Sequence, residues 1–222
     1  MVVLVSCVSL DHDADFLPHF VPYYRARGVD DVRLVLHSRA RIPRQSVPAN
    51  VDKYVCWTGE FNPSEKIRRL TDLMYGADVY VSVDVDEFAG IDDVMETWRK
   101  YDAPCVYGKM VDRFASRPGV TGPLSPDGDL FSQFPVVASN YSRNVIGMRQ
   151  PWRPFLLPGP PAKMHRFPGL GFKKWCRRCG RPPVLHHFKW THQRIDKAKE
   201  RSVHGGARGR NSRSLLRRAR HG

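Results

Sequence analysis

The stretch Tyr80-Val81-Ser82-Val83-Asp84-Val85-Asp86-Glu87-Phe88 decides the fold of this 222-residue chain. Its first half is apolar, as in a buried strand, and its second half places three carboxylates within four positions. Buried carboxylates this close repel one another, and a hard divalent cation with oxygen ligands removes that cost. In an extended strand end, Asp84 and Asp86 point to the same side and could both approach one cation. The stretch therefore predicts a strand that ends in a metal site.

Segments on both sides of this stretch alternate between strand-like and helix-like patterns. Strands are predicted over residues 1–8, 32–36, 51–57 and 79–83, with further extended chain at 106–111. Helices are predicted over residues 16–28, 65–76 and 91–101, with Ser64 as the cap of the second. This alternation is typical of a mostly parallel sheet flanked by helices on both faces. Ligands of such sheets bind beyond the carboxyl ends of the strands, which is where the acidic run lies.

The regular pattern fades after residue 112. Proline, glycine and serine are dense over residues 117–126 and 151–168, which we interpret as irregular loops that bind a substrate. We expect one domain over residues 1–195 and a basic, mobile tail over residues 196–222.

The net charge of +14 is concentrated at the C-terminal end of the chain. Residues 1–162 carry 18 Lys/Arg and 20 Asp/Glu, a net −2, whereas residues 163–222 carry 18 Lys/Arg and two acidic residues, a net +16. Such a basic segment favours polyanionic partners, including nucleic acid and anionic membrane surfaces. Without a recognisable signal peptide or an apolar stretch long enough to span a bilayer, we expect a cytoplasmic protein, with peripheral contact to the inner membrane face through the tail.

The five cysteines are scattered and odd in number, which does not suggest a disulfide scaffold. Cys176 and Cys179 form a C-x-x-C pair that precedes His186 and His187, so a zinc site is an alternative for this segment. The unusual spacing and the single C-x-x-C pair make zinc the weaker interpretation.

The acidic run and several other segments resemble family 2-like glycosyltransferases of the GT-A fold. Asp84–Phe88 is similar to their D-[AV]-D-E-F signature, and His186-His187-Phe188-Lys189-Trp190 is similar to their closing H-F-K-W block. Weaker similarities are found near residues 15–30, 64–66, 111–114, 133–135 and 163–165, so the resemblance covers residues 1–195. It implies a Rossmann-like GT-A domain and an inverting transferase that uses a nucleotide-sugar donor with Mn²⁺ or Mg²⁺.

The resemblance also implies roles for individual residues. Asp86 would be the principal metal ligand, Asp84 would contact the metal or the ribose, and His187 would complete the metal site, with His186 as the competing histidine. The expected contacts to the nucleotide sugar come from Asp11, Lys66, Asp84, His165 and Lys189. The donor would be linked to UDP, GDP or TDP, and the acceptor would be a glycan, a glycolipid or a nucleic acid.

Inversion at the sugar carbon requires a general base beside the acceptor hydroxyl. Asp112 is our candidate because it follows the strand after the metal motif, and Asp127 and Asp129 are alternatives. The alternative interpretation is a salt bridge from Asp112 to Arg113 or another arginine.

Two other classes of function compete with the transferase. The basic C-terminal segment could make the chain a nucleic-acid-binding or anionic-surface-binding protein. A strand ending in D-x-D also occurs in phosphotransferases of the haloacid dehalogenase type. Those enzymes usually carry it near the N-terminus and follow the second aspartate with Thr or Val two residues later, where this chain has Phe88.

Overall fold

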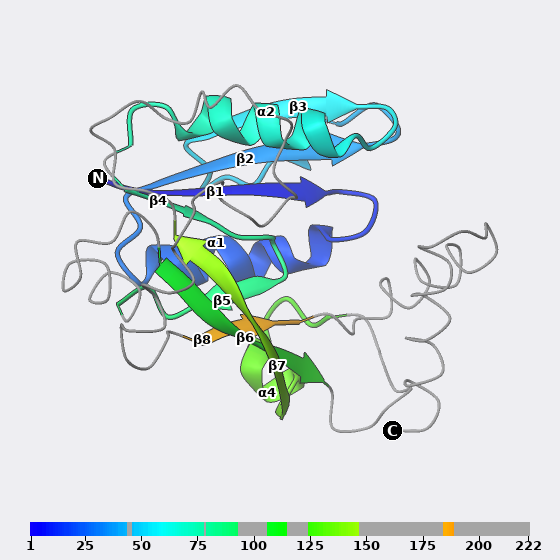
Figure 1. Cartoon of the computed structure of the whole chain (residues 1–222). Helices are drawn as coiled ribbons and strands as arrows, with labels where there is room; N and C mark the ends of the chain where they lie inside the picture. The colour runs from blue at the N-terminus through cyan, green and yellow to red at the C-terminus, as the bar shows by residue number, and fades with distance from the viewer. Residues whose placement is uncertain (44–45, 78, 93–105, 115–123, 147–183, 189–222) are drawn as a thin grey trace, which may run out of the picture.

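A computed structural model describes residues 1–43, 46–77, 79–92, 106–114, 124–146 and 184–188 (Figure 1). The elements in chain order are β1 (Val2–Ser9), a 3-10 turn η1 (Ala14–Phe16), α1 (Leu17–Arg25), β2 (Asp31–Ser38), β3 (Lys53–Thr58), α2 (Pro63–Met74), β4 (Val79–Ser82), β5 (Glu87–Ala89), β6 (Val106–Phe114), α4 (Leu130–Gln133), β7 (Val136–Ile146) and β8 (Val184–His187). The predicted helix at 91–101 lies mostly outside the described residues. Within these residues, no helix is long and apolar enough to cross a membrane.

The first half of the chain forms the predicted parallel sheet, in the strand order β3-β2-β1-β4. The chain first moves outward from β1 through β2 to β3, and then returns to place β4 on the other side of β1. The strand order therefore reverses between β1 and β4. In open α/β sheets this reversal creates a crevice at the carboxyl ends of the strands, where ligands bind. The acidic run directly follows β4 at this edge.

Helices α1 and α2 cover opposite faces of the parallel sheet, as predicted. Along β1, Leu4 and Val8 belong to the core shared with α1, whereas Val3 and Val5 belong to the core shared with α2. This alternation with a period of two is what a strand buried on both faces requires. Right-handed crossovers explain the arrangement, because the chain moves in opposite directions across the sheet in its two helical connections.

The ends of both helices follow from local chemistry. Gly28 and Gly76 adopt positive φ values of 82° and 80° just after α1 and α2, which only glycine adopts without strain. The cap of α2 is Asn62, whose side chain accepts hydrogen bonds from the backbone N–H groups of Ser64 and Glu65. The prediction of Ser64 as the cap was therefore wrong, because the helix begins at Pro63, one residue before Ser64.

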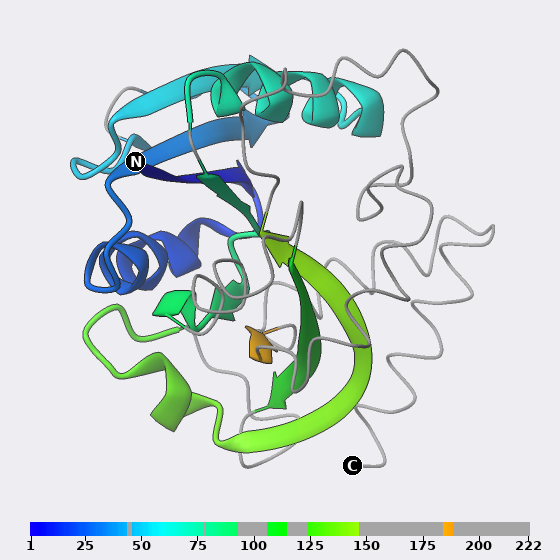
Figure 2. The same ribbon diagram turned by 60° about the vertical axis from the view of Figure 1, so that its left-hand side comes forward.

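A second sheet, in the order β5-β8-β6-β7, was not predicted (Figures 1 and 2). Strand β6 pairs with β7 in antiparallel and with β8 in parallel orientation, and β5 pairs with β8 in antiparallel orientation. Regular structure thus continues beyond residue 112, where the periodic pattern of the sequence fades, and the predicted loops at 117–126 and 151–168 lie mostly outside the described residues. The second sheet packs on α1 through one apolar cluster, in which Phe20 and Tyr24 of α1 meet Phe88.

Candidate active site at the edge of the parallel sheet

The acidic run does not continue the strand that precedes it. Strand β4 ends at Ser82, and residues 84–87 form a tight turn in which the Glu87 N–H donates to the Asp84 carbonyl at 2.9 Å. The Glu87 carboxylate in turn accepts from the Asp84 N–H at 2.9 Å. The expectation that strand alternation places Asp84 and Asp86 on one side was therefore wrong, since the backbone between them turns.

The turn sends the two aspartates to different partners. Asp84 accepts a hydrogen bond from Nζ of the buried Lys66 on α2, at 2.8 Å. Asp86 instead lies with one carboxylate oxygen 3.3 Å from Nε2 of His187 on β8. The Asp86 carbonyl also accepts from the Phe188 N–H at 2.8 Å, which ties the turn to the end of β8.

Three side chains of the second sheet lie in one row across its strands. Glu87 of β5 pairs with His187 of β8, and His187 pairs with Asp112 of β6. Paired residues of neighbouring strands point to the same face of a sheet. His187 therefore lies between two carboxylates of the row, and its Nδ1 is 2.8 Å from an Asp112 oxygen.

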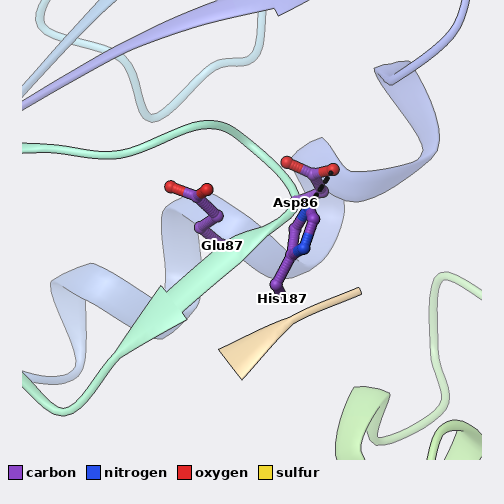
Figure 3. A group of neighbouring side chains, drawn as sticks. All are labelled: Asp86, Glu87 and His187. Carbon is purple, nitrogen blue, oxygen red and sulfur yellow. Dashed lines mark ion pairs between the residues drawn. The ribbon is translucent and has the colours of Figure 1, made fainter. Parts of the chain in front are cut away.

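In the part of the chain that the structure describes, Asp86, Glu87 and His187 form a group that could hold a metal ion (Figure 3). Each offers one ligand atom, and these atoms all lie within 4.8 Å of one another. The exposed fractions are 1% for Asp86, 1% for Glu87 and 8% for His187. Two carboxylate oxygens and an imidazole nitrogen are a donor set that suits a divalent cation. Glu87 was not among the predicted ligands, although its place in the acidic run could have suggested it.

The electrostatics of His187 reflect its two acidic neighbours. Burial by itself lowers the pKa of the imidazole, but the Asp86 charge and the hydrogen bonds to Asp112 and Asp86 outweigh burial and raise this pKa to about 9. Without a metal, the imidazole is therefore protonated at neutral pH. The proton on His187 then supplies positive charge beside the carboxylates, in the place where a bound cation could supply it.

The structure separates the two candidate histidines. His186 lies on the opposite face of β8, where its Nδ1 accepts a hydrogen bond from Nε of Arg113 at 3.2 Å and its ring contacts Phe131. Burial first, and the Arg113 charge second, lower the pKa of His186 to about 4. Strand alternation thus assigns His187 to the acidic group and His186 to the packing of the opposite face.

The other predicted residues have different surroundings. Asp11 lies just beyond β1 and accepts hydrogen bonds from Oγ of Ser38, at 2.7 Å, and from the Arg39 N–H, at 2.9 Å. These bonds link the carboxyl ends of β1 and β2. Asp129, an alternative base, caps the short helix α4, whereas Asp127 is exposed on the preceding loop. His165, Lys189, Cys176, Cys179 and the basic tail lie outside the described residues.

The comparisons with known proteins concern the fold. No protein-family model matches the chain, and no curated protein matches it. One similar solved structure is CMP:2-keto-3-deoxy-manno-octonic acid synthetase complexed with CTP, with 16% identity and a TM-score of 0.38 over 67% of this chain and 74% of that chain. A second is 4-diphosphocytidyl-2C-methyl-D-erythritol synthase, with 10% identity and a TM-score of 0.42 over 94% and 90%.

A third similar structure is TarS from S. aureus, with 7% identity and a TM-score of 0.33 over 55% of this chain and 24% of that chain. All three structures are less than 25% identical to the chain and have TM-scores below 0.5. The class that the fold itself defines is an α/β protein with a central parallel sheet flanked by helices. The function must therefore be argued from the residues of this chain.

Proposed function

We propose that this chain is a metal-dependent, inverting glycosyltransferase that moves a sugar from a nucleotide-sugar donor to an acceptor hydroxyl. The observation that carries the proposal is the buried Asp86–Glu87–His187 group, which follows β4 at the point where the strand order reverses between β1 and β4. This is the position at which open α/β sheets bind nucleotides.

The charges around the group support a bound cation. Asp86, Glu87 and Asp112 are all at least nine-tenths buried, and His187 is a basic side chain that contacts two of them. Buried carboxylates are costly unless a positive charge compensates them. A divalent cation would compensate them and, as a Lewis acid, would stabilise the charge that develops on a departing diphosphate.

The donor set favours Mn²⁺ over Mg²⁺. Mg²⁺ prefers an octahedron of oxygen ligands and keeps several waters, whereas the group combines two carboxylates with the imidazole of His187. Imidazole is a better ligand for transition metals than for hard cations. We therefore expect Asp86, Glu87 and His187 to bind Mn²⁺ more tightly than Mg²⁺, with Asp84 as a further ligand or as a contact to the ribose.

Two other predicted residues, Asp11 and Lys66, lie near the carboxyl ends of the parallel strands. Asp11 extends beyond β1, and Lys66 on α2 holds Asp84 just after β4, so these side chains flank the point where the strand order reverses. We propose that Asp11 contacts the nucleoside and that Lys66 contacts the diphosphate of a UDP-, GDP- or TDP-linked donor. Asp112 remains the predicted base. The predicted acceptors are an anionic glycan, a glycolipid or a nucleic acid.

A donor screen tests the proposed function. UDP-, GDP- and TDP-sugars are added with Mn²⁺, Mg²⁺ or chelator, and both the melting temperature and the release of nucleotide diphosphate are measured. A ligand that binds only the folded state at 100 times its Kd adds about 2.7 kcal/mol to the free energy of unfolding. We expect one donor to stabilise the protein only when Mn²⁺ is present.

Paired variants sharpen this test. Asp86→Asn removes a carboxylate charge from the group with little change of shape and should abolish the Mn²⁺-dependent stabilisation. Asp72→Asn is the matched control, because Asp72 is an exposed residue of α2 that pairs with Arg68. Unchanged transferase activity in Asp86→Asn would refute the proposal. A phosphoenzyme trapped at Asp84 would instead identify a phosphotransferase.

A further inference from the structure

Asp112 contacts the histidine of the candidate metal group without belonging to that group. Its carboxylate lies 2.8 Å from Nδ1 of His187, whereas the opposite ring nitrogen, Nε2, faces Asp86 at 3.3 Å. Asp112 is 9% exposed and lies on β6, next to β8 in the sheet. The two sides of the imidazole ring thus face two different carboxylates.

The two contacts define which nitrogen can bind a metal. Both ring nitrogens of His187 face a carboxylate, but Nδ1 lies 2.8 Å from Asp112, whereas Nε2 lies 3.3 Å from Asp86. The shorter contact assigns the proton of a neutral His187 to Nδ1, because an ionised carboxylate only accepts hydrogen bonds. Nε2 then presents its lone pair toward Asp86 and the metal group. A carboxylate that accepts from the second N–H of a metal-bound histidine fixes the tautomer and the ring orientation, and makes the nitrogen a better ligand.

We propose that Asp112 is a positioning residue, which holds His187 with Nε2 directed at the metal that it shares with Asp86 and Glu87. This inference rests on the proposed function only in requiring that the group binds a metal. It differs from the predicted role of Asp112 as general base, because here the carboxylate acts through His187 and need not touch the acceptor.

The sheet makes the arrangement rigid. The parallel register of β6 and β8 places Asp112 opposite His187, and the antiparallel register of β5 and β8 places Glu87 opposite the same histidine. Shifting either register by one residue would turn the side chains of that strand to the other face. Asp112 therefore reaches His187 from a fixed backbone position, as a positioning residue must.

Mn²⁺ binding to the full chain tests this proposal. The dissociation constant is measured by electron paramagnetic resonance, and electron spin-echo modulation of the bound Mn²⁺ reports whether an imidazole nitrogen is a ligand. Asp112→Asn keeps the shape of the side chain and removes its charge, so we expect about 10- to 100-fold weaker binding. We also expect a weaker or lost nitrogen signal. Asp112→Glu should recover part of the affinity, and Asp72→Asn should bind as the parent does.

The outcomes separate the two proposals. If Asp112→Asn binds Mn²⁺ with the affinity and nitrogen signal of the parent but has lost turnover, the positioning role is overturned. This result would favour the role of Asp112 as general base. A parent protein whose bound Mn²⁺ shows no nitrogen signal would overturn the positioning role as well. In a third outcome, the protein binds Mn²⁺ through a nitrogen ligand and Asp112→Asn weakens this binding, but the protein turns over no nucleotide sugar. This outcome would refute the proposed function and support the positioning role of Asp112. If Asp112→Asn has a lower melting temperature than the parent, the positioning role is tested by the Mn²⁺ affinity of Asp112→Glu and by the nitrogen signal of the parent.

Discussion

The hydroxyl of Tyr24 forms hydrogen bonds with the backbone at the outer edge of β5, as a neighbouring strand would. Removing this hydroxyl should destabilise the protein measurably. Among the described strands, β5 is the end strand of the second sheet. The fully buried Tyr24 donates to the Glu87 carbonyl at 2.9 Å and accepts from the Ala89 N–H at 3.0 Å. Tyr24→Phe would keep the ring contacts and remove both bonds, leaving the buried Ala89 N–H without this acceptor.

The size of the effect follows from the two bonds. A buried hydrogen bond contributes about 1 kcal/mol, and a buried donor left unsatisfied costs about 1–3 kcal/mol. We therefore expect Tyr24→Phe to lower the free energy of unfolding by about 2–4 kcal/mol. For a chain of this length, each kcal/mol corresponds to about 2–4 °C in melting temperature.

Urea unfolding followed by circular dichroism measures this difference. Tyr54→Phe is the matched control, because Tyr54 is 43% exposed and water can replace its contacts, so we expect a change below about 0.5 kcal/mol. The reasoning is refuted if the free energy of unfolding of Tyr24→Phe lies within about 0.5 kcal/mol of that of the parent. It is also refuted if Tyr54→Phe lowers the free energy of unfolding as much as Tyr24→Phe does.

Two further predictions concern titratable side chains. Burial raises the pKa of the Cys7 thiol to about 11. At pH 8, iodoacetamide should therefore label the exposed Cys56 and not Cys7 until the protein unfolds. Peptide mapping measures the labelling, and equal labelling of the two cysteines in the native protein would contradict the prediction. For His187, the pKa is raised in the folded state from 6.5 to about 9, so its contribution to stability is complete below pH 6.5 and is lost as the pH rises toward 9. In chelator, the free energy of unfolding of the parent should therefore fall over this range relative to that of His187→Gln, and parallel curves for the two proteins would contradict the assignment.

Much of the parallel sheet could be predicted from local patterns. Residues 2–9 and 31–38 are almost wholly buried strands, and their apolar character is visible in any short window of sequence. Leu17, Phe20, Val21 and Tyr24 are the buried residues of α1, with the spacing that a helix facing a sheet requires.

The second sheet could not be predicted in the same way. Strand β8 has four residues and β5 has three, too few for a periodic pattern to identify. These strands exist because they pair with one another across about a hundred residues of chain, and such pairing leaves no local signal.

The sequence alone determined the α/β class and the position of the acidic run beyond the fourth parallel strand, because hydrophobic periodicity is a local property of the chain. The tertiary structure decided how that run is divided: the turn at residues 84–87 directs Asp84 to Lys66 and Asp86 to His187. It also brought Glu87 and Asp112 to opposite sides of His187 and assigned His186 to the other face. The physical reason is that these contacts depend on the register between strands distant in sequence, which only the folded chain defines.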